Sequence, residues 1–480
     1  MQLQDVLADV AVIATNCQMD MEIGGICHDS RTAQRGDLFV AIAGFKQDGN
    51  KYITAARAAG ALAVVCENVP SDDIPYIQVV NARVALAAVA ANFCAHPARA
   101  MTMIGVTGTN GKTTVTYLLK EVLEARGAVV GLIGTNQNMI GDTPVYTERT
   151  TPEPNELQHL LRRMADAGCT HVVMEVSSHS LVLGRVYGIE FQLGIFTNVS
   201  QDHLDFHNTM EEYIAAKALL FAQCRHGVVN LDDDAACAVM AGGMCDFTTY
   251  STRNNKADVT AENIHLKADG VMFEAVCKNQ IARVELAIPG EFSVYNALAV
   301  VAAAHAIGVT LADVAHALKS AKGVKGRAEV VPTKTDYTVM IDYAHSPDGL
   351  QNILKTVRGF AAGRVIAVFG CGGDRDRLKR PIMGEVASRL SDITIVTSDN
   401  PRTEVPMAII SDILPGIVCD SAHFHVEPDR RAAIYYALDI AQAGDVIVLA
   451  GKGHETYQEI NGIKNHLDER EIIAEYFLKK

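Results

Sequence analysis

The sequence predicts an α/β protein of three domains in which parallel strands alternate with helices. Its length of 480 residues corresponds to about three domains at roughly 150 residues each. Short apolar runs end repeatedly in glycine or charged residues before a helical pattern begins, which is typical of α/β units. With 49% hydrophobic and 20% charged residues, the composition excludes a chain that is disordered throughout.

The expected strands are continuous runs of Val, Ile and other apolar residues rather than alternating patterns. Such runs are typical of strands that are buried on both faces of a parallel sheet. They are Met101–Thr107, His171–Val176, Phe191–Thr197, Thr338–Tyr343, Val365–Phe369, Ile393–Thr397 and Val446–Ala450. The Ala-rich stretches Arg83–Ala95 and Ala297–Val309 predict buried helices, since a membrane-spanning helix needs about 20 apolar residues.

Two candidate boundaries divide the chain into segments 1–98, 99–328 and 329–480. The first lies in the His96–Arg99 stretch, directly before an expected strand. The second lies within Gly323–Glu329, where Gly and Lys alternate after an Ala-rich helix. Each segment has the size of an ordinary domain.

Charge and cysteine usage exclude several classes of protein. The 42 Lys and Arg against 56 Asp and Glu give a net charge of −14, which opposes binding to nucleic acid. The first residues lack the basic start of a secretory signal, and eleven cysteines without a C-x-x-C pair argue against a disulfide framework or a zinc site. We therefore expect a cytoplasmic protein, acting as a monomer, without nucleic-acid or membrane partners.

The stretch from Gly105 to Thr114 has the arrangement of a phosphate-binding loop. It lies between an expected strand and a helix whose apolar residues recur at helical spacing. Backbone N–H groups of such a loop bind phosphate oxygens, Lys112 supplies a charge for the β- and γ-phosphates, and the Thr113 hydroxyl can reach Mg²⁺. The glycine spacing is unusual, because Val106 stands where the general pattern has Gly. The alternative is a glycine-rich turn with a surface lysine.

Polar residues follow the next two expected strands. Glu175 ends one of them, and the segment Asn198–His207 follows the other. Open α/β sheets bind ligands at the carboxyl ends of their strands, and Mg²⁺ prefers hard oxygen ligands. Taken singly, Glu175 could be a salt-bridged loop carboxylate and His203 a structural histidine, whereas together with the loop they predict a nucleotide·Mg²⁺ site.

The order of these and later motifs resembles that of the Mur ligases, and the unusual glycine spacing is that family's version of the loop. The resemblance spans nearly the whole chain. The motifs are Thr107–Thr113, Glu175–His179, Asn198–His207, Tyr295–Ala297, Gly326–Glu329, Asp342–Pro347 and Asp399–Arg402. It implies an ATP-dependent, amide-forming ligase of peptidoglycan synthesis. The implied architecture is an N-terminal UDP-binding domain, a central ATPase domain and a Rossmann-like C-terminal domain.

The resemblance also implies the residues that bind ATP and Mg²⁺. The residues implied for ATP are Gly108, Thr109, Asn110, Gly111, Lys112, Thr113, Thr114, Asn296, Arg327 and Asp342. Those implied for the metal are Thr113, Glu175, His203 and Lys217, and the catalytic residues are Lys112, Glu175, His203 and Lys217. On sequence alone Lys217 is a solvated helix lysine. The resemblance instead implies a carbamylated lysine whose carbamate offers oxygen ligands to a second Mg²⁺.

The segment Asp29–Ala41 and the motif Thr150–Pro152 resemble the family members that add the third peptide residue. By resemblance, the UDP-linked muramoyl dipeptide would be held by Ser30, the loop Gly44–Gln47, Thr150, Thr151, Ser177 and Arg185. Two departures from the family pattern concern this site. Leu183 stands where the family has Gln, and Phe45-Lys46-Gln47 replaces a His-Gln pair.

The C-terminal segment has three polar strand ends that we expect at one edge of its sheet. They are Phe369–Arg377, Ser398–Arg402 and Gly451–Glu455. Two arginines and two carboxylates suit a zwitterion, and an arginine at the far end favours meso-diaminopimelate, with its second carboxylate, over L-lysine. The resemblance implies Arg375, Asp399, Asn400, Pro401, Arg402, Gly451 and Glu455 for this substrate.

The expected reaction begins with attack of the D-Glu γ-carboxylate on ATP and continues through an acyl phosphate to an amide. Alternatives are an L-lysine-adding member of the family, a folylpolyglutamate-synthase-like ligase, a P-loop small-molecule kinase and a catalytically silent binding protein. The silent protein is disfavoured because Lys112, Glu175 and His203 are all present. His345 receives no role.

Overall fold

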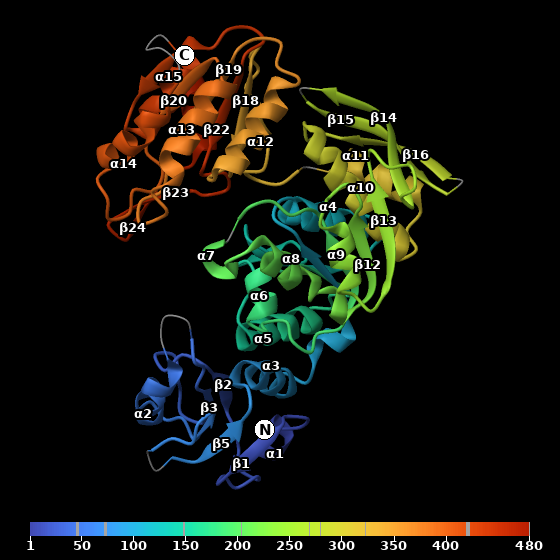
Figure 1. Ribbon diagram of the computed structural model, residues 1–480, viewed down its shortest axis with the longest axis vertical. Helices are drawn as coiled ribbons and strands as arrows, with labels where there is room; N and C mark the ends of the chain where they lie inside the picture. Colours follow the sequence, from blue (N-terminus) through green and yellow to red (C-terminus); the bar gives the residue numbers. More distant parts are fainter. Residues whose placement is uncertain are drawn as a thin grey trace. The chain divides into compact units, whose positions relative to one another are not determined.

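The computed structural model describes residues 1–44, 48–71, 74–146, 149–202, 204–267, 269–278, 280–321, 323–418 and 423–479. The chain divides into two compact units, which are Met1–Val259 with Ala302–Val309, and Thr260–Val301 with Thr310–Lys480. Figure 1 labels their helices and strands. Within the described ranges, the helices fall short of the length and apolar character that a membrane span requires.

The first unit begins with a five-stranded sheet in the order β1-β5-β4-β3-β2. β1 pairs antiparallel with β5, and the other neighbours are parallel. The strands are β1 (Val12–Thr15), β2 (Gly25–Cys27), β3 (Asp37–Val40), β4 (Ala63–Cys66) and β5 (Tyr76–Val79). The helices are α1 (Leu3–Val6), α2 (Ile53–Ala58) and α3 (Ala82–Phe93). Leu86 and Val89 of α3 join the core that covers this sheet.

A larger sheet forms the rest of the first unit, with neighbouring strands in the order β13-β12-β11-β6-β10-β7-β8-β9. The strands from β13 to β7 are parallel, and β8 and β9 are antiparallel. They are β6 (Thr102–Thr107), β7 (Val130–Ile133), β8 (Asn138–Ile140), β9 (Thr143–Val145), β10 (His171–Glu175), β11 (Phe191–Phe196), β12 (Cys224–Asn230) and β13 (Asp246–Ser251). The helices are α4 (Lys112–Glu124), α5 (Pro154–Asp166), α6 (Ser178–Val182), α7 (Leu204–His207), α8 (Met210–Ala218) and α9 (Ala236–Ala241).

The central position of β6 brings three strand ends together. Val106 is opposite Glu175 of β10, and Thr107 is opposite Phe196 of β11. The loop after β6 therefore starts beside Glu175 and beside the segment that follows β11.

The second unit contains most of β14 (Val259–Lys267), with β15 (Gly270–Cys277) and β16 (Gln280–Leu286), followed by most of α10 (Glu291–Ala306) and by α11 (Leu311–Lys319). Its six-stranded sheet has the order β17-β18-β22-β19-β20-β21, parallel except for β17. These strands are β17 (Glu329–Val331), β18 (Thr338–Asp342), β19 (Val365–Phe369), β20 (Ile393–Val396), β21 (Phe424–Val426) and β22 (Val446–Ala450). The hairpin strands are β23 (Tyr457–Ile460) and β24 (Ile463–His466), and the helices are α12 (Pro347–Arg358), α13 (Lys379–Leu390), α14 (Pro406–Ile413), α15 (Arg430–Ile440) and α16 (Glu469–Lys479).

The structure confirms the expected α/β class and each of the expected strands, whose ends differ by at most one residue. The apolar runs succeed as predictors because their residues are buried on both faces, as in β19 and β22. The antiparallel strands β15 and β16 were not expected. Buried and partly exposed residues alternate along most of β15, and the first four residues of β16 are exposed or partly exposed, so neither strand is a continuous buried run. The boundaries at 98 and 328 stay predictions.

Candidate active site

The loop between β6 and α4 closes around its own lysine. Lys112 Nζ donates hydrogen bonds to the carbonyl oxygens of Gly108 and Thr109, at 2.8 Å each. Gly108 and Gly111 have φ of +147° and +86°, a region that favours glycine. A Cβ on Gly108 would overlap Thr197 Oγ1, so only glycine fits this close approach.

The segment after β11 fixes the other side of the loop. The Thr109 N–H donates a hydrogen bond to the carbonyl oxygen of Asn198 (2.8 Å), and the Asn110 N–H donates one to Asn198 Oδ1 (2.9 Å). Thr197 Oγ1 donates to the Asn110 carbonyl at 2.6 Å. Thr113 is buried in the first turn of α4. The strand, the glycine-rich loop and the helix predicted from the sequence are thus present, and phosphate binding by the loop stays a prediction.

Replacing Gly108 with alanine is expected to lower ATP-dependent turnover and to destabilise the protein by about 2 kcal/mol or more, because left-handed strain adds to the overlap with Thr197. Gly127→Ala is the matched control, since Gly127 also has positive φ, at +83°, but no atom lies within 4 Å of its added Cβ. Thermal unfolding and the KM for ATP would be measured for both. Equal effects in the two variants would contradict the assigned packing.

Glu175 is almost completely buried, with 1% of its surface exposed. Oε1 accepts a hydrogen bond from the Thr135 N–H at 2.9 Å, and Oε2 accepts from the Thr135 hydroxyl at 3.0 Å. The Thr135 hydroxyl is also 3.0 Å from Thr150 Oγ1. Glu175 is therefore a positioned carboxylate at the strand end, and Thr135 is a neighbour that sequence reasoning missed.

Three of the residues expected to hold the dipeptide surround this strand end. Thr151 Oγ1 donates to the carbonyl oxygen of Glu175 at 2.9 Å and accepts from the N–H of Ser177 at 3.3 Å. Arg185 Nη1 donates to the Thr151 carbonyl at 3.0 Å, and Arg185 Nη2 pairs with Glu153 at 2.6 Å. Burial lowers the pKa of Arg185, and the charge of Glu153 opposes that shift. Arg185 is thus linked, through Thr151, to the backbone at the end of β10.

The remaining residues expected for the dipeptide lie elsewhere or outside the described ranges. Ser30 lies in the N-terminal five-stranded part, between Asp29 and Arg31, which form an ion pair at 2.6 Å. Leu183 follows the last residue of α6. Phe45, Lys46 and Gln47 lie outside the described residues, as does His203.

Lys217 is buried in α8, with 1% of its surface exposed, so the expectation of a solvated lysine is wrong. Its Nζ lies 4.1 Å from the centre of the Tyr213 ring. Burial and the nearby positive charge of Lys112 lower the pKa of Lys217 well below its usual range. The negative charges of Asp202 and Asp233 oppose this shift only in part. Burial therefore disfavours the charged ammonium form relative to that of an exposed lysine. Sequence reasoning failed because the burial of Lys217 arises from the packing of α8 against both α6 and α9, which its local sequence does not show.

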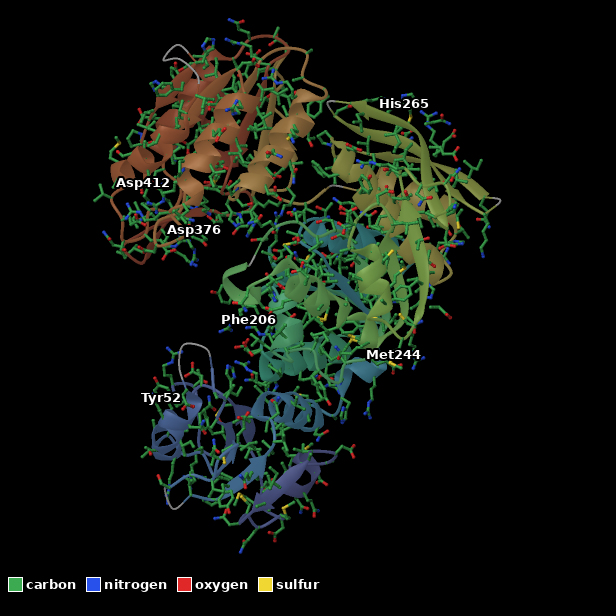
Figure 2. The ribbon with its side chains drawn as sticks, in the orientation of Figure 1. Tyr52, Phe206, Met244, His265, Asp376 and Asp412 are labelled. Atoms are coloured by element: carbon green, nitrogen blue, oxygen red, sulfur yellow. The ribbon has the colours of Figure 1, made fainter. Side chains whose placement is uncertain are left out.

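Tyr213 connects Lys217 to the phosphate loop. The Tyr213 hydroxyl lies 3.1 Å from Thr109 Oγ1, and this hydroxyl of Thr109 accepts from the N–H of Ser200 at 3.0 Å. The Phe206 ring, labelled in Figure 2, lies on α7 with its centre 4.1 Å from that of His179. Tyr213 thus contacts both Lys217 and the loop residue Thr109.

In the second unit, Asp342 and Arg327 are neighbours. Asp342, at the end of β18, accepts hydrogen bonds from the N–H groups of Ala328, at 2.7 Å, and Ala344, at 2.8 Å. Burial raises the pKa of Asp342, and the charge of Arg327 opposes the rise. The Arg327 guanidinium lies over the Tyr343 ring at 4.9 Å. Asn296 is buried on α10.

The carboxyl edge of the C-terminal sheet gathers Asp399, Asn400 and Glu455. Asn400 Nδ2 donates to Glu455 Oε2 at 2.9 Å. The fully buried Lys452 donates to Asn400 Oδ1 at 3.0 Å and to Glu455 Oε2 at 2.9 Å. Sequence reasoning missed Lys452, although it stands between two residues that were selected, Gly451 and Glu455.

Asp399 keeps one carboxylate oxygen without a hydrogen-bond partner among the described residues, although that oxygen, Oδ2, is buried. A Cβ on Gly451 would lie 2.6 Å from it, so glycine leaves the space beside this oxygen open. A buried anionic oxygen needs a partner. An ammonium group of a ligand would provide one.

Arg402 and Arg375 both border Gly372. A Cβ on Gly372 would lie 2.9 Å from Arg402 Nη1 and 3.7 Å from Arg375 Cγ. Arg402 Nη1 donates to the Gly373 carbonyl at 2.7 Å, and its Nε lies 3.3 Å from Glu459 Oε2. Arg375 is exposed. The two guanidinium-bearing side chains expected to bind a carboxylate therefore lie together.

Comparison with known families agrees with this arrangement. Three family descriptions match in order along the chain: Mur ligase family, catalytic domain, over residues 22–99; Mur ligase middle domain, over residues 106–304; and Mur ligase, glutamate ligase domain, over residues 326–453.

Individual proteins are similar over nearly the full length. UDP-N-acetylmuramoyl-L-alanyl-D-glutamate–2,6-diaminopimelate ligase of Clostridium botulinum is 48% identical over 461 residues, which cover 95% of each chain. The protein of the same name from Clostridium tetani is 45% identical and covers 99% of each chain. A solved structure with this name has 33% identity and a TM-score of 0.74, and the match covers 100% of this chain and 99% of that one. This chain belongs to the Mur ligase family.

Proposed function

We propose that this protein uses ATP to join meso-diaminopimelate to the D-Glu γ-carboxylate of UDP-N-acetylmuramoyl-L-alanyl-D-glutamate, in peptidoglycan synthesis. The observation that carries the proposal is the similarity over 95% of the chain, at 48% identity, to a ligase named for these two substrates. The geometry supports it, because a phosphate loop lies in one unit and a site suited to a zwitterion lies in the other.

The first half of the reaction is phosphoryl transfer. An oxygen of the γ-carboxylate attacks the γ-phosphorus of ATP, the bond to the β,γ-bridging oxygen breaks, and ADP leaves an acyl phosphate behind. Little covalent chemistry falls to the protein, so positioning and charge neutralisation dominate catalysis. Lys112 carries the positive charge of the loop, and the described strand ends supply Thr151, Ser177 and Arg185 to hold the carboxylate-bearing substrate.

The residues near the loop fit Mg²⁺, which prefers oxygen ligands. Thr113 offers a hydroxyl and Glu175 offers a carboxylate that Thr135 holds in place. When bound, the ion neutralises charge on the phosphate oxygens. We assign Thr113, Glu175, His203 and carbamylated Lys217 as metal ligands, with the carbamate of Lys217 serving a second Mg²⁺.

Carbamylation of Lys217 agrees with the state of its amine. A neutral amine attacks CO₂, an N–C bond forms, and one proton leaves, so that a carbamate anion results. Burial lowers the pKa of Lys217, so the neutral amine is available without a strong base. The product carries carboxylate oxygens that can bind a cation, which the amine lacks.

The second half is attack by a neutral amine of the amino acid on the acyl phosphate. A tetrahedral intermediate forms and expels inorganic phosphate as the amide forms. Arg402 and Arg375 suit the distal carboxylate of meso-diaminopimelate, and Asp399 Oδ2, which has no hydrogen-bond partner among the described residues, suits its ammonium. L-Lysine lacks that carboxylate and would leave the two arginines without a substrate carboxylate to bind.

ADP release in omission experiments tests the proposed reaction. We expect rapid ADP and phosphate release only when ATP, the UDP-linked dipeptide and meso-diaminopimelate are all present. A P-loop kinase would instead release ADP without the amino acid and transfer phosphate to a stable product. That result would contradict the ligase assignment.

Replacing Arg402 with alanine is expected to raise the KM for meso-diaminopimelate about 10- to 100-fold, because a charge-assisted hydrogen bond contributes roughly 1.5–3 kcal/mol. The KM for ATP should change less than about twofold. Arg389→Ala is the control, since Arg389 is an exposed helix residue that pairs with Glu385. An unchanged KM for meso-diaminopimelate in Arg402→Ala would contradict this assignment of Arg402.

The setting of the reaction is also a proposal. Every cysteine in the described ranges is free, which fits a reducing compartment. We therefore place the enzyme in the cytoplasm, and we expect it to act as a monomer without nucleic-acid or membrane partners.

A further inference from the structure

Two loops of the C-terminal sheet meet beside the assigned amino-acid site. Residues 370–377, which follow β19, form the Gly372 loop, and residues 398–405, which follow β20, form the Asn400 loop. The Gly373 N–H donates to the Asn400 carbonyl at 2.9 Å. A Cβ on Gly373 would overlap the Pro401 carbonyl oxygen. The loops are therefore in direct backbone contact, and one assigned arginine belongs to each of them.

Glu404 joins both loops to α13. Its Oε1 accepts hydrogen bonds from the Asp374 N–H and from Arg380 Nη2, both at 2.7 Å, and its Oε2 accepts from Arg380 Nη1 at 2.9 Å. The Arg380 side chain is fully buried, whereas that of Glu404 is 23% exposed. Bidentate pairing of this kind fixes orientation as well as distance, so the Asn400 loop is held at a set position on α13.

A reciprocal contact completes the connection. Asp374 accepts from the Thr403 hydroxyl at 2.7 Å and from the Thr403 N–H at 3.2 Å. Asp374 thus donates its backbone N–H to Glu404 and receives two hydrogen bonds from Thr403. Arg375 and Arg402 are the chain neighbours of Asp374 and Thr403, so a shift of one loop against the other would separate the two arginines.

We propose that Glu404, held by Arg380, is a positioning residue for the amino-acid substrate. It keeps the Gly372 and Asn400 loops together so that Arg375 and Arg402 share the space beside Gly372. Glu404 itself is committed to Arg380 and Asp374 and binds no substrate. This inference rests on the proposed function.

Arg380 has a second carboxylate partner, which provides a matched control. Asp412 Oδ2 accepts from Arg380 Nη1 at 2.8 Å and pairs with Arg377 at 2.9 Å. Figure 2 labels Asp412, which lies on α14, and Asp376, which lies in the Gly372 loop. Asp412→Asn removes one of the two carboxylate charges that pair with Arg380, and Glu404→Gln removes the other. Unlike Glu404, Asp412 has no described hydrogen bond to the Asn400 loop.

Steady-state kinetics of the full-length protein would compare these variants. Glu404→Gln is expected to raise the KM for meso-diaminopimelate about tenfold or more, with the KM values for ATP and the UDP-linked dipeptide within about twofold of wild type. Asp412→Asn should leave all three KM values within about twofold. A general loss of stability would instead lower activity towards all substrates alike in both variants.

Asp374→Asn provides a second test at an exposed position, where folding is not at risk. This change weakens the hydrogen bonds that the side chain of residue 374 accepts from Thr403. We expect it to raise the KM for meso-diaminopimelate by a smaller factor than Glu404→Gln does. Unchanged KM values for meso-diaminopimelate in both Glu404→Gln and Asp374→Asn, or equal rises in Glu404→Gln and Asp412→Asn, would overturn the inference. Failure of the wild type to consume meso-diaminopimelate would overturn the proposed function instead, whatever the variants do.

Discussion

Replacing Lys217 with alanine is expected to lower kcat about 10³-fold while the protein stays folded. The reason is that a carbamate on Lys217 would supply oxygen ligands to a cation, and loss of a metal ligand costs several kcal/mol of transition-state stabilisation. Measurement of phosphate release at saturating substrates gives kcat directly. A small carboxylate such as formate, added at high concentration, should restore part of the activity because it can occupy the space of the carbamate.

Lys120→Met is the matched control for this variant. Lys120 is also a buried lysine, with 5% of its surface exposed, and it pairs with Glu124 of the same helix at 2.6 Å. Its loss should reduce stability without a comparable loss of kcat. If Lys217→Ala kept wild-type kcat, the assignment of Lys217 to the metal site would be wrong.

The pH dependence of stability provides a second measurement on Lys217. Its pKa in the folded protein lies well below the ordinary value of 10.5, so between these two values the unfolded chain binds more protons. The free energy of unfolding should therefore rise with pH across that interval in CO₂-free buffer. Lys217→Met lacks this contribution, and the difference between the two profiles isolates it. Parallel profiles would contradict the buried, neutral amine.

Replacing Lys112 with methionine is expected to lower kcat by about the same factor, roughly 10³-fold. Lys112 supplies the charge of the phosphate loop, and its Nζ donates to the carbonyl groups of Gly108 and Thr109. The variant therefore loses both a charge for the phosphates and an internal connection of the loop. Single-turnover phosphate release would measure the chemical step.

Lys112→Arg separates these two effects. It keeps the charge, but its planar guanidinium cannot reproduce the compact ammonium that reaches two carbonyl oxygens of one tight loop. We expect it to remain severely impaired. Wild-type turnover in Lys112→Met would contradict the assignment of this loop to ATP.

The parts of the fold that follow from local pattern were predictable. β19 and β22 are continuous apolar runs whose residues are all buried, so the sequence marks them directly. The phosphate loop was predictable for a related reason, since a strand, closely spaced glycines and an amphipathic helix agree with one another.

Features that depend on tertiary packing were not predictable in this way. Lys217 lies among small residues in α8, and its burial arises from the helices on either side of α8. Likewise, the contact of Glu404 with Arg380 joins residues 24 positions apart in the chain, with no spacing rule that connects them. Lys452 is a similar case, because its partners Asn400 and Glu455 come from two separate strand ends.

A competition experiment tests the central claim most directly. The purified protein would receive ATP, Mg²⁺ and the UDP-linked muramoyl dipeptide together with equal concentrations of meso-diaminopimelate and L-lysine, and mass spectrometry would identify the nucleotide product. The account predicts a product heavier by one diaminopimelate residue, with the new amide at the D-Glu γ-carboxylate. A product that carries lysine would contradict the assignment of Arg402 and Arg375, and a phosphorylated dipeptide without an amino acid would contradict the ligase itself.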